Sequence, residues 1–551
     1  MANHGKGKQG AGSSQGKQKA KGQGSPRKKD RARNRADVGK RRVPKGAHAE
    51  GEGSTAGEHP AAGAPAYGGR ASGASRARGE AACGRPAQGK SARAVGRGGK
   101  PAGATPSPCS VDRVCGGCEN ISVPYKKQLV EKQVAIERLF ANLADERAFR
   151  LIRGMKDPFH YRNKVISPYA PGKKIEPAQP SAQSAKGKKK PPARHEILTG
   201  MYVAGTHELV PTDSCLIENE AAKKVTLAVR DIMREHGIAP YREDTGTGFM
   251  RHAVVRAARS TGEVLVTLVT NADEFPASKS FCRELVERCP EVTTVVQNVN
   301  ERQTNVILGD KERVLFGPGF IFDELCGLSF RISSKSFYQV NAVQAEVLYE
   351  CAIELARLDG TQTVIDAYCG TGTIGLAAAA RGAARVIGVD SVPDAIRDAQ
   401  QNARHNGVEN AEFVAADATE FMEGLADKGL GEGEGELVVL MDPPRAGSTE
   451  RFLAAAAALS PARIVYVSCN PQTQARDVEY LYDLGYRVVA VQPVDMFPHT
   501  AHIECIVCLE PDGPRVHELF PFDGDAAAGF DGASDANGSS RVAAATGKAR
   551  S

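Results

Sequence analysis

The stretch Thr363-Val-Ile-Asp366-Ala-Tyr-Cys-Gly370-Thr-Gly372-Thr-Ile-Gly375 decides the fold. A short apolar run is followed by three glycines in the spacing G-x-G-x-x-G, which is typical of a strand, a tight turn and the start of a helix. Asp390 lies 20 residues beyond Gly370, at the end of the next apolar run. This arrangement suits either a dinucleotide or the nucleoside part of S-adenosylmethionine, and the loop alone also fits a glycine turn in an unrelated α/β protein.

Apolar runs end in a polar residue or a cysteine at regular intervals from this loop onward. Asp366, Asp390, Asp417, Asp442 and Cys469 follow one another at 24, 27, 25 and 27 residues, about one strand, one helix and their connections each time. This spacing predicts a doubly wound, Rossmann-like parallel sheet in an α/β domain, because the strands alternate with helices. All five side chains are expected beside the carboxyl ends of the strands, where such sheets bind ligands.

The turn Met441-Asp442-Pro-Pro-Arg445 and two residues after it carry candidate chemistry. The prolines fix an extended turn, with one carboxylate aimed into the crevice. Cys469 ends an apolar run between Ser, Asn and Pro, where its thiolate could act as a nucleophile. Glu504 is the candidate base, and alternation along its strand predicts that it shares a face with His502. A thiolate, a base and a nucleotide-like cofactor are the parts needed to alkylate carbon 5 of a pyrimidine.

Five short motifs together resemble the RNA uracil-5-methyltransferase family over roughly residues 109–510: Phe337-Tyr-Gln339-Val-Asn341, Asp366-Ala-Tyr-Cys-Gly370, Asp442-Pro-Pro-Arg445, Ser468-Cys469-Asn-Pro471 and His502-Ile-Glu504. The resemblance implies a class I methyltransferase in which Cys469 adds to carbon 6 of uracil and Glu504 removes the carbon-5 proton. Cytosine-directed enzymes place a second cysteine beside the prolines, so uracil is the expected base, extruded from its stack. The implied contacts to S-adenosylmethionine are Gln339, Tyr368, Gly370, Thr373, Asp390, Asp417 (at the adenine amino group) and Asp442.

Four upstream cysteines form a second candidate site: Cys109, Cys115, Cys118 and Cys215. Four thiols suit a tetrahedral site for zinc or an iron–sulfur cluster, and Cys115 with Cys118 alone could be the redox pair of a nucleotide-dependent oxidoreductase. Members of the resembling family with this spacing hold a [4Fe-4S] cluster. The resemblance therefore implies that cluster here, and it favours 23S ribosomal RNA over transfer RNA as the target. Buried thiols are expected at Cys282, Cys289, Cys326, Cys351, Cys505 and Cys508, and Cys369 is expected to be a bystander in the cofactor loop.

Composition, the change of rhythm near residue 330 and the family resemblance together divide the chain into four parts. Residues 1–108 hold 23 Lys/Arg against 6 Asp/Glu, so a disordered basic tail is expected there, serving as a non-specific arm for nucleic acid. An α+β iron–sulfur and RNA-binding domain is predicted over 109–329, with an exposed insertion at 171–194. The methyltransferase domain is predicted over 330–511 and a disordered tail over 512–551. In the second part, Tyr161-Arg-Asn-Lys164 and Arg251-His252 are candidates to grip phosphates or stack bases.

The chain shows no apolar run of the roughly 18–20 residues that span a bilayer, and its basic N-terminus lacks the apolar core of a secretory signal. These features predict a cytoplasmic enzyme with RNA, most simply 23S ribosomal RNA, as its partner. No membrane and no obligate protein partner are expected. A transfer-RNA uridine methyltransferase and a non-catalytic RNA-binding protein with the same fold stay open as alternatives.

Overall fold

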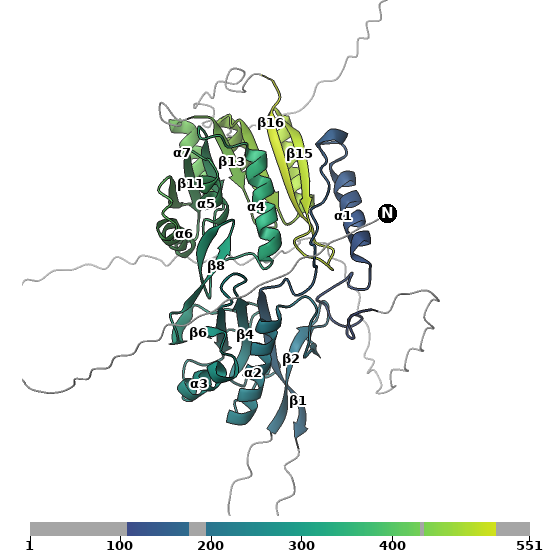
Figure 1. Cartoon of the computed structure of the whole chain (residues 1–551), viewed down its shortest axis with the longest axis vertical. Helices are drawn as coiled ribbons and strands as arrows, with labels where there is room; N and C mark the ends of the chain where they lie inside the picture. Colours follow the sequence, from purple (N-terminus) through teal and green to yellow (C-terminus); the bar gives the residue numbers. More distant parts are fainter. Residues whose placement is uncertain (1–106, 176–193, 430–434, 514–551) are drawn as a thin grey trace, which may run out of the picture. The chain divides into compact units, whose positions relative to one another are not determined.

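The computed structural model describes residues 107–175, 194–429 and 435–513 (Figure 1). Apart from residues 107–108 and 512–513, the predicted tails 1–108 and 512–551 lie outside these residues, as does the middle of the predicted insertion 171–194, so these predictions stay open. The strands on either side of that insertion are present and pair antiparallel, Pro171 opposite Ile197. Within the described ranges, no helix is long and apolar enough to cross a membrane.

The first sheet has seven strands, and two helices cover one of its faces. Its α2 and α3 pack on Val165, Val255 and Val266. All neighbouring strands are antiparallel except β5 and β6, which α3 connects as a parallel pair. In spatial order the strands are β3 (Leu209–Pro211), β2 (Arg194–Tyr202), β1 (Lys164–Ile175), β4 (Met250–Ala257), β5 (Val264–Thr270), β6 (Val292–Val299) and β7 (Lys311–Phe316), with α2 over Glu220–His236 and α3 over Ser278–Arg288.

The second sheet is the predicted doubly wound sheet, and this prediction is confirmed. Six of its seven strands run in one direction, and β16 is inserted antiparallel between β14 and β15. Its strands are almost wholly apolar because helices bury both faces, as parallel sheets require. In spatial order they are β12 (Ala411–Ala415), β11 (Arg385–Asp390), β10 (Thr363–Ala367), β13 (Leu437–Met441), β14 (Arg463–Ser468), β16 (Glu504–Pro511) and β15 (Tyr486–Val494).

Seven helices bury the two faces of this sheet. One face packs against α4 (Ala342–Ala356), α5 (Thr373–Ala380) and α6 (Pro393–His405). The other packs against α7 (Ala418–Lys428), α8 (Glu450–Ala458), α9 (Pro471–Asp483) and α1 (Tyr125–Phe140). Alanine-rich stretches in α5 and α8 allow close helix–sheet approach, since both helices bury several small side chains. The ends of the parallel strands therefore stay uncovered for ligands.

Two elements join the sheets within one compact unit. Helix α1 precedes the first sheet in sequence, yet its Ile136 and Phe140 are buried in the core of the second sheet. A one-turn 3-10 helix, Glu146–Ala148, follows it and packs against β15. The hairpin of β8 (Phe320–Leu325) and β9 (Leu328–Ser333) packs against β5 and β6 on one side and against α4 and α6 on the other (Figure 1). This hairpin crosses the predicted domain boundary at residue 329, a boundary that stays a prediction.

Candidate active site

The glycine loop makes a tight turn from β10 into α5. Tyr368 has a φ of 64°, uncommon for a residue with a side chain, and Gly372 has a φ of 79° at the start of α5. A Cβ on Gly372 would lie 2.8 Å from the ring of Phe413, so only glycine fits there. The Gly375 backbone N–H donates to Asp366 Oδ2 at 2.8 Å, which fastens the helix start to the end of the strand.

Asp390 fixes the rim of this turn from the neighbouring strand. It is the last residue of β11, as predicted. Its Oδ2 accepts a hydrogen bond from the Gly370 N–H at 3.0 Å, and its Oδ1 accepts from the Val392 N–H at 2.8 Å. The carboxylate is therefore held beside the glycine turn, where ribose hydroxyls are bound in folds of this type.

A single cavity of about 1230 Å³ brings eight of the nine predicted cofactor and catalytic residues together. It exceeds the ordinary range for one small ligand, about 300–1000 Å³, so it has room for a cofactor and a base. Asp417 is the ninth and does not line the cavity. Its exposed carboxylate instead caps α7 by accepting from the Thr419 and Glu420 N–H groups. The eight are Gln339, Tyr368, Gly370, Thr373, Asp390, Asp442, Cys469 and Glu504.

Strand register places Cys469 beside Glu504. In the antiparallel pair of β14 and β16, Ser468 is opposite Cys505, so the next position puts Cys469 opposite Glu504. Side chains of directly opposite residues lie on one face with Cβ atoms about 4.5–5.5 Å apart. Insertion of β16 beside β14 therefore creates the pair, although 34 residues separate the two in sequence. His502 does not share this environment: it precedes the strand and is exposed, while Glu504 is 3% exposed, so the expected shared face is wrong.

Cys469, Glu504 and Asp442 are three of the acidic groups that line this cavity. Burial raises the pKa of Asp442 to about 7. Burial, and then the nearby Asp442 carboxylate, raise the pKa of Glu504 to about 8. Burial, Glu504 and Asp442 together raise the pKa of Cys469 to about 11, against a small opposing effect of Arg445. A cation bound among them would favour all three ionised forms.

Helix α9 holds the Asp442-Pro-Pro-Arg445 turn in place. Asn470 Nδ2 and Thr473 Oγ1 both donate to the Arg445 carbonyl, at 3.0 and 3.2 Å. Asp477 Oδ2 accepts from the Ser448 N–H at 2.8 Å, and the Ser448 hydroxyl lies 3.1 Å from that of Tyr368. The same helix thus fixes the turn after Asp442 and begins at Pro471, two residues after Cys469.

The first sheet supports the cofactor side of the cavity through residues that sequence analysis did not assign to this role. Arg256 of β4 is 2% exposed and donates to the carbonyls of Ser336 at 2.9 Å and Tyr338 at 3.3 Å. Asn163 Nδ2 donates to the Gln339 carbonyl at 3.0 Å. Asn163 lies inside the Tyr161–Lys164 motif, which sequence analysis singled out for RNA contact and not for this role. No feature of the sequence pointed to Arg256.

Of the residues predicted to bind phosphates or bases, one lines the large cavity and others are buried within the protein. Arg162 lines the large cavity. Arg251 is instead used internally, because its guanidinium donates to the Asn300 and Arg302 carbonyls and lies over the Tyr241 ring. His252 is buried, and the Tyr161 hydroxyl donates to the Pro498 carbonyl at 3.0 Å.

The four upstream cysteines line one small cavity of about 30 Å³. Burial and the neighbouring thiols of Cys215, Cys115 and Cys109 raise the pKa of Cys118 to about 12. Across the described part of the chain, no three His, Cys, Asp or Glu side chains are grouped as ligands of a metal ion. The six cysteines expected to be buried are all buried, and Cys369 is buried in the glycine loop.

Comparisons with known proteins agree with this site. The family model described as tRNA (Uracil-5-)-methyltransferase matches residues 268–512. A protein of Halalkalibacterium halodurans described as an uncharacterized RNA methyltransferase is 40% identical over 406 residues, 73% of this chain and 83% of that protein. A Bacillus cereus protein with the same description is 41% identical over 404 residues, 73% of this chain and 82% of that protein. The chain belongs to the RNA uracil-5-methyltransferase family.

Membership of this family confirms the predicted enzyme class, a methyl-transferring enzyme that acts on RNA. Among solved structures, the Pyrococcus abyssi tRNA (uracil-54, C5)-methyltransferase in complex with S-adenosyl-L-homocysteine superposes with a TM-score of 0.56 at 27% identity. The match covers 72% of this chain and 86% of that one. The uracil-5-methyltransferase fold thus extends over both sheets, well beyond the residues that the family model matches.

Proposed function

We propose that the protein methylates carbon 5 of uridine in RNA, with S-adenosylmethionine as methyl donor and Cys469 as the nucleophile. The observation that carries this proposal is the register of β14 and β16, which sets Cys469 opposite the buried Glu504 inside the large cavity. A thiol paired with a carboxyl group and open to a nucleoside-sized space has the parts for nucleophilic activation of a pyrimidine.

Cys469 and Glu504 divide the covalent chemistry. The Cys469 thiolate would add to carbon 6 of the uracil. The electron pair displaced onto carbon 5 would form the new bond to the methyl carbon as the bond between that carbon and the cofactor's sulfur breaks, leaving S-adenosylhomocysteine. Glu504 then takes the proton from carbon 5, and elimination breaks the bond between carbon 6 and sulfur. Glu504 must be ionised for its step, and in the free protein its pKa of about 8 keeps it largely protonated at neutral pH.

The cofactor supplies an electrophilic methyl group on a positively charged sulfur. We assign the ribose to Asp390, which the Gly370 and Val392 N–H groups orient, and the remaining contacts to Gln339, Tyr368, Gly370 and Thr373. Asp442 is placed to attract the positive charge, since burial leaves its carboxylate poorly solvated without one. Asp417 is the weakest assignment, because its carboxylate already accepts two N–H groups of α7.

We further propose that Cys109, Cys115, Cys118 and Cys215 hold a [4Fe-4S] cluster. Their thiols line one cavity, and burial together with the neighbouring thiols raises the pKa of Cys118, so a bound cation would favour the thiolate forms. The cluster would serve structure, since the proposed methyl transfer involves no electron transfer.

The proposed target is 23S ribosomal RNA in the cytoplasm, on the strength of the four-cysteine spacing. Transfer RNA is the second candidate, because the superposed Pyrococcus abyssi structure is a tRNA (uracil-54, C5)-methyltransferase. Mapping 5-methyluridine in ribosomal and transfer RNA from cells with and without the protein separates them. We expect one or more 23S positions to lose the methyl group. A loss confined to transfer RNA would overturn the ribosomal target, and no change in either RNA would overturn the proposed reaction.

A further inference from the structure

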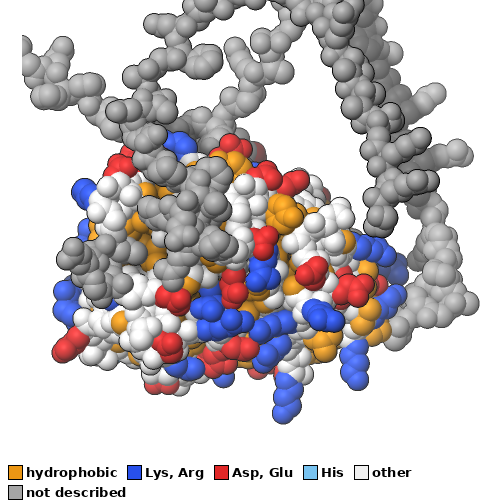
Figure 2. All heavy atoms as spheres, turned by 90° about the horizontal axis from the view of Figure 1, so that it is seen from above, with side chains coloured by type: hydrophobic (Ala, Val, Ile, Leu, Met, Phe, Trp, Pro, Cys, Tyr) orange, Lys and Arg blue, Asp and Glu red, His pale blue; other side chains and the backbone are white. Residues whose placement is uncertain are grey.

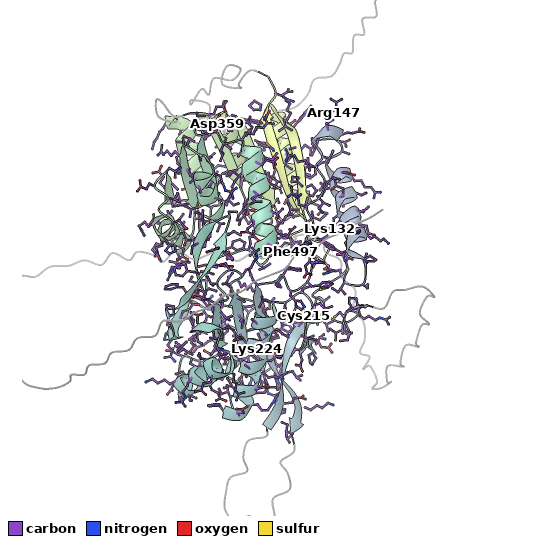
Figure 3. All side chains as sticks on the ribbon, viewed as in Figure 1. Lys132, Arg147, Cys215, Lys224, Asp359 and Phe497 are labelled. Carbon is purple, nitrogen blue, oxygen red and sulfur yellow. The ribbon has the colours of Figure 1, made fainter. Side chains whose placement is uncertain are left out.

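The loop between β15 and β16, residues 495–503, leads directly into Glu504 and lies against α1. Lys132 of α1 is 5% exposed, and its ammonium group donates to three acceptors on this loop. They are Asp495 Oδ1 at 2.6 Å, the Phe497 carbonyl at 3.2 Å and the His502 carbonyl at 2.8 Å. Figure 3 shows Lys132 on α1 beside Phe497. One side chain thus ties both ends of the loop and a point between them.

The ion pair of Lys132 with Asp495 is buried and completely hydrogen-bonded. Asp495 is 0% exposed, and its second oxygen accepts from the Tyr125 hydroxyl at 2.7 Å. Replacing a buried pair by apolar side chains of similar volume is often neutral or stabilising, because desolvation offsets the attraction. Stability alone therefore gives no reason for this pair. Its three-point geometry fits a role in fixing one conformation of the loop.

A second set of contacts fixes the middle of the same loop. Gln128 bonds both the backbone N–H and the ring of His499, at 3.0 and 3.1 Å. The Asn120 N–H, two residues after Cys118, donates to the His499 carbonyl at 2.9 Å. His499 has a φ of 68°, a strained conformation that persists only where the surroundings over-determine it. The loop is thus held from α1 and from the cysteine segment, outside the methyltransferase sheet.

The fastened loop forms part of the active cavity. Phe497 lines that cavity together with Cys469 and Glu504, and the His502 carbonyl bonded to Lys132 is only two residues before Glu504. We propose that Lys132 is a positioning residue for Glu504: through its grip on residues 495–502 it sets the carboxyl group against carbon 5 of the base. This inference rests on the proposed role of Glu504.

The test removes the grip and follows the step that Glu504 performs. The double variant Lys132→Met with Asp495→Asn avoids an unpaired buried charge and keeps the side-chain volumes. We expect kcat to fall by up to about 100-fold, the cost of a small misplacement, while the affinity for S-adenosylmethionine is retained. Elimination should become limiting, so a covalent Cys469–RNA adduct carrying labelled methyl should accumulate on denaturing gels. A merely structural defect would not accumulate this adduct.

The matched control is a solvent-exposed ion pair on the same helix. Lys127 and Glu131 are exposed and 3.7 Å apart, so Lys127→Met with Glu131→Gln should leave kcat and adduct level unchanged. If the Lys132 double variant does not fold, the single variant Lys132→Arg replaces it in the test. It keeps the charge but cannot place one ammonium group on three acceptors, so a lower kcat with adduct is expected.

Glu504→Gln, run in parallel, separates the two proposals. If it accumulates adduct while a folded Lys132 variant turns over at the wild-type rate without adduct, only the role of Lys132 is overturned. If Glu504→Gln itself turns over normally, the base assignment fails, and the inference on Lys132 fails with it.

Discussion

At the residue scale, the active cavity places several acidic groups close together, and their protonation depends on what else is bound there. In the proposed reaction Cys469 and Glu504 must each be ionised at a different stage, and Asp442 adds another acidic group to the same cavity. Their pKa values of about 11, 8 and 7 are all raised, chiefly by burial, which disfavours the ionised form of each group. A positively charged sulfonium would lower all three, which couples cofactor binding to activation of the thiol.

The thiol of Cys469 should be indispensable for methyl transfer and dispensable for cofactor binding. Cys469→Ala should lower methylation by about 10⁴-fold or more, because carbon 5 of uracil is unreactive without addition at carbon 6. Calorimetric titration should give an S-adenosylmethionine affinity close to that of the wild type. Alanine at the neighbouring buried Cys505 is the control for general damage. Substantial methylation by Cys469→Ala would remove this residue from the role.

The pH dependence of adduct decay should report Glu504. Once the methyl group has left, the positive charge is gone and the pKa of Glu504 returns toward about 8. Below that value the carboxyl group is protonated and cannot accept the carbon-5 proton. Rapid-quench experiments should therefore show the wild-type adduct persisting at pH 6 and decaying faster as the pH rises through 8. A decay rate independent of pH across this range would contradict the assignment.

At the element scale, the catalytic pair depends on how three elements meet. Register sets Cys469 of the β14 end opposite Glu504 of β16, and α9 begins between them. Gln474, in the first turn of α9, donates to the carbonyls of Tyr466 at 2.8 Å and Cys505 at 3.0 Å, so it clamps the two strands next to the pair.

Breaking this clamp should cost both stability and activity. Gln474→Met keeps the volume but removes one donor from each of two buried carbonyls, so the free energy of unfolding should fall by about 1–3 kcal/mol in urea titrations. Splayed strands should also lower kcat. Gln400→Met is a matched control, because Gln400 Nε2 likewise bonds a strand carbonyl, that of Phe413, at 3.1 Å but on α6. It should lose stability with kcat intact, and an unchanged kcat in Gln474→Met would refute the clamp.

Features that depend on neighbouring residues could be predicted from the sequence, and features that depend on residues far apart in the sequence could not. The strand–helix rhythm and the glycine turn are local patterns, so the doubly wound sheet and the positions of Asp390 and Asp442 could be predicted. Helix α1 could not be oriented, since its buried stripe of Gln128, Lys132, Ile136 and Phe140 is half polar. The hydrogen bonds from Gln128 to His499 and from Lys132 to Asp495 join residues more than 360 positions apart, and no local pattern predicts them.

At the scale of the whole molecule, the cysteine segment and the methyltransferase sheet are mechanically linked. The Asn120 N–H bonds His499 in the loop before Glu504, and Cys118 and Cys215 pack with Tyr161, whose hydroxyl bonds Pro498. The proposed cluster would therefore stabilise the neighbourhood of the active cavity without taking part in the reaction. Metal binding at such a site contributes directly to folding.

Anaerobically purified protein should be brown and contain about four iron atoms per chain. Cys115→Ala should lose both the colour and thermal stability, and amide exchange in residues 495–503 should become faster. Cys282→Ala, which removes a buried thiol from the core of the first sheet, should keep its iron. Plasma emission spectroscopy measures the iron content, and mass spectrometry measures the amide hydrogen exchange. Stoichiometric zinc without iron would contradict the cluster.

The charge of the molecule is divided unevenly, and this division predicts how it holds RNA. The whole chain carries +7 and residues 1–108 carry +17, so residues 109–551 carry −10. On the face seen in Figure 2, lysine and arginine side chains lie among aspartate and glutamate side chains, which weakens long-range attraction to a polyanion. We expect the basic N-terminal segment to supply much of the non-specific affinity for RNA.

Deletion of residues 1–106 should therefore weaken RNA binding and flatten its salt dependence. Each phosphate contact contributes about −0.7 to the slope of log K against log salt for a single strand, because bound counterions are released. Losing even five contacts would make the slope about 3.5 less negative. At saturating RNA the truncated protein should keep its kcat, since Cys469, Glu504 and the cavity lie outside the deleted segment. Filter binding from low to high salt measures the slope. An unchanged slope would assign RNA affinity to cationic residues of the folded part, with Arg162 at the cavity as the first to substitute.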